Sequence, residues 1–84
     1  MTQARTEIEV DARGLLCPLP VLRLRKRLQS VAAGQVVRLL ATDPAAVIDI
    51  PHFCAEGGHE LLDSAALADG ATAWRIRAGA ARQV

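Results

Sequence analysis

The segment Asp11-Ala12-Arg13-Gly14-Leu15-Leu16-Cys17-Pro18-Leu19-Pro20 decides the fold, because the chain changes from a strand to a helix within it. The stretch that leads into it, Glu7-Ile8-Glu9-Val10-Asp11, alternates polar and apolar residues, which predicts a short strand. Proline is tolerated in the first turn of a helix, because the backbone N–H groups there have no helical partner. Pro18 and Pro20 therefore predict that a helix starts at Cys17, after a short loop.

The predicted first helix extends to Gly34 and has two distinct faces. The apolar residues of one face should pack on a sheet: Val21, Leu24, Leu28 and Val31. Leu19 and Leu22 fall outside this stripe, so we expect them to be exposed near Cys17. Basic residues cluster on the side opposite the core: Arg23, Lys26 and Arg27.

A strand and a second helix are predicted next. Val36 to Ala41 is almost continuously apolar, as in a central strand, so the helix before it implies a parallel β-α-β unit with a right-handed crossover. Thr42-Asp43-Pro44 is typical of a helix start, with Asp43 as the polar cap. We expect the second helix over Ala45 to Glu56, kinked or split by Pro51.

Gly57-Gly58 stops the second helix, and two weaker strands follow. They are predicted over Glu60 to Ser64 or Ala66 and over Ala73 to Arg77, with an Asp69-Gly70 turn between them. The order β-α-β-α-β-β predicts an α/β (α+β) two-layer sandwich, in which two helices cover one face of a four-stranded mixed sheet. We expect one domain over residues 1–84, with frayed ends at 1–6 and 79–84.

Composition narrows the functional classes. The chain has 84 residues, 51% of them hydrophobic, which supports one small globular domain and argues against disorder. A net charge of +1 is too small for a protein that coats nucleic acid. Residues 1–10 lack the apolar segment of a signal peptide, and no apolar run approaches the roughly 20 residues of a membrane helix. We therefore expect a soluble cytoplasmic protein that does not act at a membrane.

Cys17 is the candidate reactive group. At a helix N-terminus, free N–H groups and the helix dipole favour a negative charge, so the sequence predicts a lowered thiol pKa, to which Arg13 could contribute. A persulfide is also an anion and would be held by the same N–H groups, as thiol–persulfide exchange requires. The alternative is an inert cysteine that fills apolar space, since most lone cysteines in small domains do so.

The sequence resembles the TusA family, also called SirA-like sulfurtransferases. The similarity lies in Asp11 to Pro20, the basic helix up to Gly34, Thr42-Asp43-Pro44-Ala45, Asp49-Ile50-Pro51-His52-Phe53-Cys54, Gly58-His59-Glu60-Leu61 and Ile76-Arg77. The strand segment Ala73-Trp74-Arg75 departs from the family, where other aromatics are common. The resemblance implies the two-layer sandwich named above and a persulfide on the cysteine of the CPxP motif, which is Cys17.

The resemblance also implies partners. The sulfur would come from a cysteine desulfurase or a rhodanese and pass to a DsrE-like or other acceptor protein, with the chain acting stoichiometrically and needing no resident cofactor. The end use would be 2-thiouridine in tRNA, molybdenum-cofactor supply or sulfur oxidation. We expect five residues to shape the site: Arg13, Gly14, Pro18, Pro20 and Asp43.

The remaining polar and basic residues have plainer interpretations. The spacing of the cysteines and histidines matches no zinc-binding pattern, so we expect no metal at Cys17, His52, Cys54 and His59. We interpret the two histidines as surface or capping residues. Asp49 is interpreted as a solvated helix residue. Cys54 reads as a packed thiol, with an auxiliary thiol as the alternative. We interpret Leu19, Leu22, Arg23, Lys26 and Arg27 as a partner-docking surface of a monomer, not a site for RNA or DNA, because aromatics for base stacking are absent nearby.

Two functional classes therefore stay open. One is a sulfur carrier, for which Cys17→Ser abolishes function, with a thiosulfate-handling component of sulfur import as a variant. The other is a non-catalytic binding or regulatory module of the same fold, for which Cys17→Ser is silent.

Overall fold

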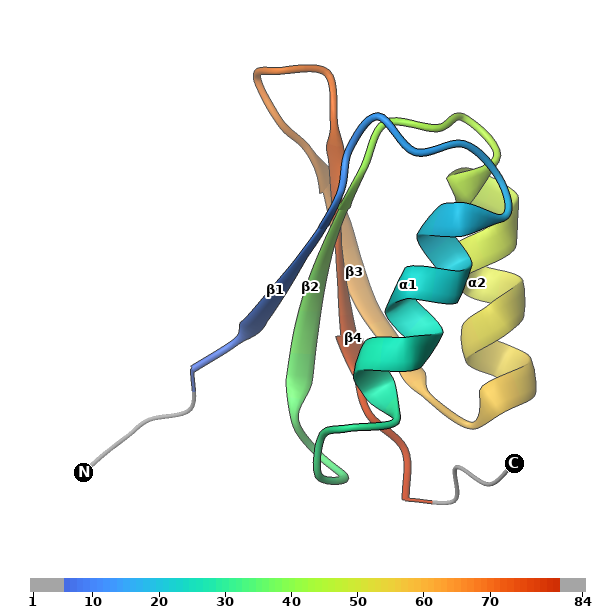
Figure 1. Ribbon diagram of the computed structural model, residues 1–84. Helices are drawn as coiled ribbons and strands as arrows, with labels where there is room; N and C mark the ends of the chain where they lie inside the picture. The colour runs from blue at the N-terminus through green and yellow to red at the C-terminus, as the bar shows by residue number, and fades with distance from the viewer. Residues whose placement is uncertain (1–5, 81–84) are drawn as a thin grey trace.

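The computed structural model describes residues 6–80 (Figure 1), so the predicted fraying falls mostly on residues outside this range. The elements are β1 (Ile8–Ala12), α1 (Leu19–Leu28), β2 (Val36–Ala41), α2 (Ala46–Gly57), β3 (Glu60–Ala66) and β4 (Thr72–Arg77). The predicted order β-α-β-α-β-β is confirmed. Neither helix combines the length and the apolar character that a membrane crossing requires, within the part of the chain that the structure describes.

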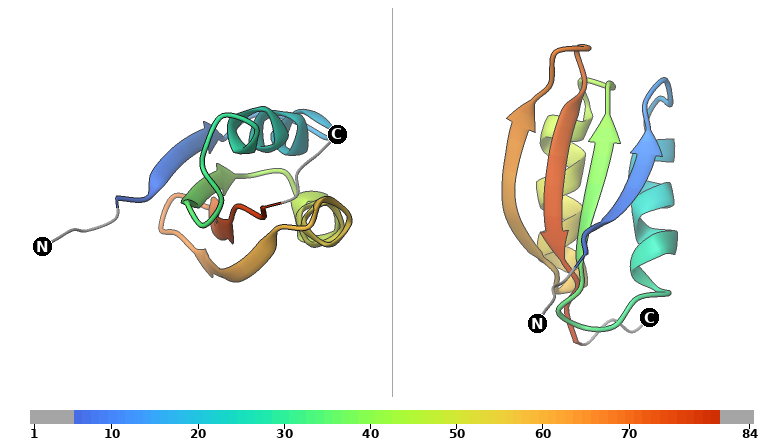
Figure 2. Two further views of the ribbon diagram at one scale, coloured as in Figure 1. Left: turned by 90° about the horizontal axis from the view of Figure 1, so that it is seen from below. Right: turned by 90° about the vertical axis from the view of Figure 1, so that its left-hand side faces the viewer.

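The four strands form one mixed sheet in the order β1-β2-β4-β3. β1 and β2 are parallel, as the intervening helix predicts, while β4 pairs antiparallel with both β2 and β3. Both helices lie against the same face of the sheet, which Figure 1 and the right-hand view of Figure 2 show plainly. The predicted two-layer α+β sandwich is therefore confirmed.

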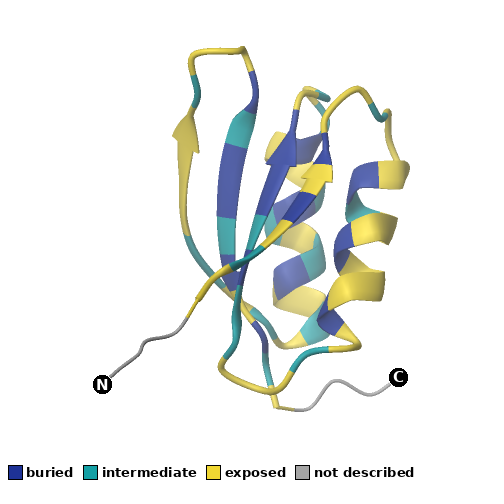
Figure 3. Ribbon diagram, turned by 60° about the vertical axis from the view of Figure 1, so that its left-hand side comes forward, coloured by how far each residue is buried: buried dark blue, intermediate teal, exposed yellow. Residues whose placement is uncertain are grey.

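The hydrophobic core lies between the helices and the sheet, and burial in Figure 3 follows this layer. The largest fully buried side chains come from both layers: Leu24, Leu28, Ile50 and Cys54 from the helices, and Val37, Leu39 and Ile76 from the strands. The structure adds Pro20 to the predicted core face of α1, since Pro20 is buried, and Val21 of that face is only partly buried. The second proline of the motif therefore anchors the start of α1 to the core.

α1 ends at Leu28, and the prediction that it continues to Gly34 is wrong. The Ser30 hydroxyl donates to the carbonyl of Arg27 at 2.8 Å, and the Ser30 N–H bonds to the same carbonyl at 3.0 Å. These bonds tighten the chain into a turn, because a serine side chain competes with helical hydrogen bonding. Val31 packs against the core from this turn, and Gly34, with φ of 91°, precedes β2.

α2 is a single helix from Ala46 to Gly57, so of the predicted kink or split at Pro51 the split is wrong, while the kink stays a prediction. Ile50 and Cys54 are buried on one face of α2, on either side of Pro51, and hold the helix on the core. Gly58 has φ of 76° and closes the helix in the left-handed conformation, as the Gly57-Gly58 pair predicts.

Candidate functional site

Three connections meet at one end of the sheet. β1 and β2 are parallel and their last residues, Ala12 and Ala41, pair directly, so the loops that follow them start side by side. The turn between β3 and β4 reaches the same end (Figure 1). Cys17 lies in the first of these loops and Asp43 in the second, which places both at the edge where loops of parallel strands converge.

Two hydrogen bonds from backbone N–H groups to side chains join the two loops, one at Gly14 and one at Cys17 itself. The Gly14 N–H donates to Thr42 Oγ1 at 2.9 Å, and the Cys17 N–H donates to Asp43 Oδ2 at 2.8 Å. Gly14 has φ of 81°, a conformation that side chains other than glycine rarely adopt. The loop that carries Cys17 is thus shaped by one glycine and by two side chains of the neighbouring loop.

Asp43 does not cap α2, so that interpretation is wrong. The residue before the helix is Ala45, and no side chain makes a capping hydrogen bond there. The Asp43 carboxylate is turned to the neighbouring loop, where it accepts the Cys17 N–H. A cap was expected because the sequence shows only the residues that precede a helix and not the loop beside it.

Arg13 ties the Cys17 loop to the β3–β4 turn. Its Nε donates to Asp11 Oδ1 at 2.9 Å and its Nη1 donates to Asp69 Oδ2 at 2.8 Å. The Arg13 side chain and backbone N–H hold the pKa of Asp11 down at about 2. Arg13 is thus engaged by two carboxylates, and it is not among the groups that shift the Cys17 pKa, a contribution that the sequence had left open.

The start of α1 offers the Cys17 sulfur fewer donors than predicted. The helix begins at Leu19, two residues after Cys17, and the Cys17–Pro18 peptide bond is cis. The Leu19 N–H bonds to the carbonyl of Leu16 at 2.8 Å, while Pro18 and Pro20 have no N–H to donate. The prolines that mark the helix start also remove donors from it.

The pKa of the Cys17 thiol is raised, and the predicted lowering is wrong. The largest cause is a hydrogen bond with the Asp49 carboxylate, followed by desolvation and by the negative charges of Asp49 and Asp43. Cys17 is nevertheless exposed and free. The site therefore presents an accessible thiol whose ionisation is disfavoured by two carboxylates.

Cys54 occupies a contrasting environment. It lies in α2 and is 2% exposed, and burial raises its pKa to about 11. The interpretation of Cys54 as a packed thiol is confirmed, and the auxiliary role loses support, because this thiol is both shielded and protonated at neutral pH. Cys54 and Cys17 are both free.

The histidines lie apart from the Cys17 loop. His52 is exposed and pairs with Glu56 at 3.5 Å, while the His59 ring stacks on Phe53 with centroids 5.6 Å apart and Nδ1 accepts the Gly79 N–H. Within residues 6–80, no three or more His, Cys, Asp or Glu residues gather as a metal site would need.

Exposed apolar side chains lie on the loop and on both helices near Cys17. Leu19 and Leu22 are 49% and 45% exposed, as predicted, and three further residues join them: Leu16, Val47 and Ile48. The basic residues Arg23, Lys26 and Arg27 line a groove of about 670 Å³ between α1 and β1, together with Glu9 and Asp11. The predicted apolar and basic surfaces of α1 are therefore both present.

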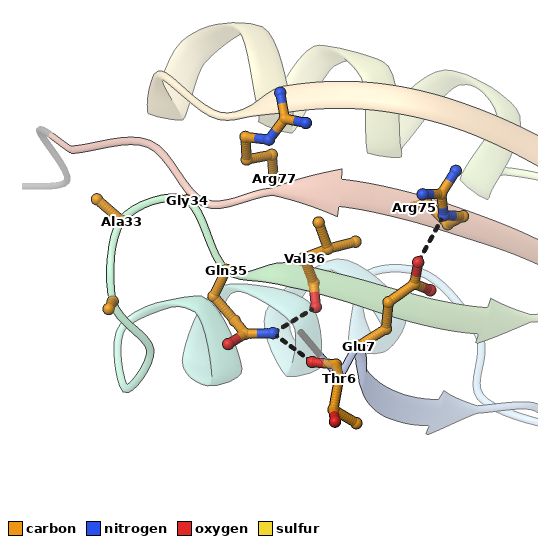
Figure 4. A pocket seen from close by; sticks show the side chains of 9 residues that line it. Thr6, Glu7, Ala33, Gly34, Gln35, Val36, Arg75 and Arg77 are labelled. Carbon is orange, nitrogen blue, oxygen red and sulfur yellow. Dashed lines mark hydrogen bonds and ion pairs between the residues drawn. The ribbon is translucent and has the colours of Figure 1, made fainter. Parts of the chain in front are cut away.

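A second cavity, of about 570 Å³, lies at the opposite end of the sheet, beside the starts of β1 and β2 (Figure 4). Its charged side chains already have partners, since Arg75 pairs with Glu7 at 3.1 Å and Arg77 pairs with Glu60 at 2.7 Å. It lacks a reactive group, so Cys17 identifies the candidate site.

Sequence reasoning missed Asp49, Asp69 and Thr42. The parallel pairing of the first two strands was a usable signal, because it brings the start of the second helix next to the Cys17 loop. Asp49 lies in the first turn of that helix. Asp69 was read as a turn residue, and the sequence does not show that the turn reaches Arg13.

Comparison with known proteins agrees with the fold and with the family that the sequence resembles. Residues 8–78 match the family model described as "Sulfurtransferase TusA". The chain is 48% identical to the sulfur carrier protein TusA of Allochromatium vinosum over 56 residues, which cover 67% of this chain and 74% of that protein. It is also 48% identical to the sulfur carrier protein TusA of Pseudomonas entomophila over 62 residues, covering 74% and 78%.

A solved structure is similar as well. The crystal structure of a SirA-like protein from Desulfitobacterium hafniense superposes with a TM-score of 0.75 at 29% identity, covering 86% of this chain and 97% of that one.

Proposed function

The chain belongs to the TusA sulfurtransferase family, and on this premise we propose that it carries sulfur as a persulfide on Cys17. The observation that supports this most is the contrast between its two thiols. Cys17 is exposed on a loop at the end of the sheet, whereas Cys54 is buried. A sulfur atom that must be received and handed on has to sit on a thiol that two partners can reach.

The persulfide is a covalently carried group, and the chain needs no further cofactor in this proposal. Sulfur arrives from a cysteine desulfurase or a rhodanese and leaves to a DsrE-like or other acceptor protein. Transfer moves a sulfane sulfur from one thiol to another, so each exchange consumes no oxidant or reductant. The carried sulfur then serves tRNA 2-thiouridine synthesis, molybdenum-cofactor supply or sulfur oxidation. A free exposed thiol suits a reducing compartment, so we place this work in the cytoplasm.

Intact mass measurement tests the proposal. The wild type, Cys17→Ser and Cys54→Ser are incubated with a cysteine desulfurase, pyridoxal phosphate and cysteine, or with a rhodanese and thiosulfate. We expect the wild type and Cys54→Ser to gain the mass of one sulfur atom and Cys17→Ser to gain none. The donor that works identifies the class of partner. No gain with either donor would instead favour a non-catalytic module of the same fold.

The surface around Cys17 supports docking of these partners. Leu19 and Leu22 supply an exposed apolar centre, and Arg23 and Lys26 flank it with positive charge. Charges at the edge of an interface steer association more than they set its affinity. An acidic partner surface would therefore be captured faster by this side of α1.

Reversing those charges tests the docking surface. We expect the double variant Arg23→Glu, Lys26→Glu to slow sulfur loading about tenfold at low salt, with the difference shrinking as salt screens the charges. The double variant Arg75→Glu, Arg77→Glu, at the opposite end of the sheet, serves as the control with the same change of net charge. Equal loading rates for the wild type and the double variant would remove the docking surface from the proposal.

A further inference from the structure

β1 is an edge strand, and a groove runs along its outer side. Among residues 6–80 it pairs with β2 alone, and the right-hand view of Figure 2 shows it at one edge of the sheet with α1 behind it. The groove of about 670 Å³ between α1 and β1 is lined on the strand side by Glu9, Val10 and Asp11. An edge strand presents unpaired backbone N–H and C=O groups, to which a further strand can bind.

The backbone of Asp11 points into this groove. Arg23, which lines the groove from α1, donates from Nη1 to the Asp11 carbonyl at 3.3 Å, a long hydrogen bond. The N–H and C=O of one strand residue point to the same side, and successive residues alternate. Glu9 therefore directs its backbone groups to the groove as well, whereas those of Val10 point to β2. A segment laid along the groove would meet the outward backbone groups of two residues.

The helix side of the groove carries positive charge that no carboxylate of residues 6–80 neutralises. The described arginines outside α1 are each engaged by a carboxylate: Arg13, Arg38, Arg75 and Arg77. The basic residues of α1 that line the groove are exposed and form no ion pair within the same residues: Arg23, Lys26 and Arg27. Their charge is therefore available to an acidic group that enters the groove.

The strand side of the groove has the opposite charge. Val10 is buried under the helices, so Glu9 and Asp11 point to the open face of the sheet, where they pair with Arg38 and Arg13. The side chains of a segment beside β1 would alternate between α1 and this open face. The groove therefore suits acidic residues at the positions that face α1 and uncharged residues at the positions between them.

We propose that this groove binds an extended acidic segment of a partner protein as a fifth strand beside β1. Main-chain hydrogen bonds to Glu9 and Asp11 supply the pairing, and carboxylates at alternate positions of the segment meet the basic residues of α1. β1 leads directly into the loop that carries Cys17, so the bound segment holds its protein near that thiol and raises its effective concentration there. The inference goes beyond the carrier role proposed above, because the binding itself does not require sulfur transfer.

Amide exchange with water, followed by NMR, tests the proposal. The probe is a blocked peptide of alternating Glu and Thr, about seven residues long, as strands commonly are. At about 90% saturation we expect exchange of the Glu9 and Asp11 amides to slow about tenfold, because it then proceeds from the roughly one molecule in ten that is free. The Val10 amide, which points to β2, should change little. A peptide of alternating Lys and Thr is the control and should not bind.

Two pairs of variants separate strand addition from charge attraction. Glu9→Pro removes the outward N–H and should abolish peptide binding, since proline is tolerated on an edge strand but cannot donate. Glu9→Thr loses the same carboxylate, keeps the N–H and should bind at least as tightly as the wild type. The double variant Arg23→Gln, Lys26→Gln should bind about tenfold more weakly. The double variant Arg75→Gln, Arg77→Gln, at the opposite end of the sheet, should bind unchanged.

The proposal is overturned if the acidic peptide does not bind, or if the basic peptide binds equally well. It is also overturned if binding shifts the signals of α1 but leaves the exchange of Glu9 and Asp11 unchanged, because charge attraction alone then accounts for it. Should Glu9→Pro fail to fold, the exchange pattern of the wild type decides. These measurements involve no sulfur. Peptide binding without sulfur loading would count against the carrier role alone, and loading without peptide binding against the fifth strand alone.

Discussion

The two cysteines of this chain both have a raised pKa, but for different physical reasons. Cys54 is buried in the face of α2 that packs on the sheet, and its thiolate is disfavoured by desolvation. Cys17 is exposed, and its thiolate is disfavoured mainly by the Asp49 carboxylate. The first cause persists as long as the fold does, whereas the second can be altered by any group that approaches Asp49.

Under the proposed carrier role, accessibility, more than the direction of a pKa shift, distinguishes Cys17 from Cys54. The difference between the two thiols also extends to their surroundings. The region around Cys54 is stabilised by burial of apolar side chains, whereas the Cys17 loop is held by exposed hydrogen bonds and ion pairs. The two regions should therefore respond to opposite extremes of pH.

The larger effect on stability is expected at alkaline pH and tests the buried region around Cys54. The folded pKa is about 11, above the ordinary value of 9.0, so the unfolded thiol ionises first as pH rises. The free energy of unfolding should then fall by about 2 kcal/mol between about pH 9 and about pH 11. Urea unfolding of Cys17→Ser and of Cys17→Ser, Cys54→Ala measures this, because the second variant lacks the buried thiol. Equal losses of unfolding free energy in the two variants would show that ionisation of Cys54 does not destabilise the fold, and would contradict this comparison of the two thiols.

A smaller effect is expected at acid pH and tests the Cys17 loop. The pKa of Asp11 is lowered to about 2 from 3.8, chiefly by the hydrogen bonds that the Arg13 side chain donates. Its contribution is present above about pH 4 and is lost as pH falls towards about pH 2. We expect the wild type to lose more stability over this range than Asp11→Asn, and Arg13→Gln to resemble that variant. The difference in lost stability between the wild type and Asp11→Asn should be smaller than the loss expected at alkaline pH, because exposed charges are screened by solvent.

The fold was predictable from the sequence to a large degree. Alternation before Cys17, the apolar run of β2 and the Gly57-Gly58 stop give the element order, and the helix between β1 and β2 gives their parallel pairing. The end of α1 was not predictable. It depends on the hydrogen bond that the Ser30 hydroxyl donates to the Arg27 carbonyl, and a serine in the sequence does not by itself predict that bond.

The site was predictable only in part. The CPxP motif identifies Cys17, but its electrostatics depend on contacts 26 residues away for Asp43 and on the first turn of α2 for Asp49. A helix N-terminus suggests a stabilised thiolate, while the structure places two carboxylates there and leaves few free donors. Tertiary contacts between loops therefore reverse an expectation that local sequence supports.

The most direct test lets both thiols compete within one wild-type molecule. After sulfur loading, the persulfide is trapped with an alkylating reagent and the chain is cut with trypsin, which separates the thiols because Cys17 lies between Arg13 and Arg23 and Cys54 between Arg38 and Arg75. We predict that the added sulfur appears on the Cys17 peptide, with Cys54 recovered as an unmodified thiol after denaturation. Sulfur on the Cys54 peptide, or on neither, would contradict the assignment of Cys17 as the sulfur-carrying residue.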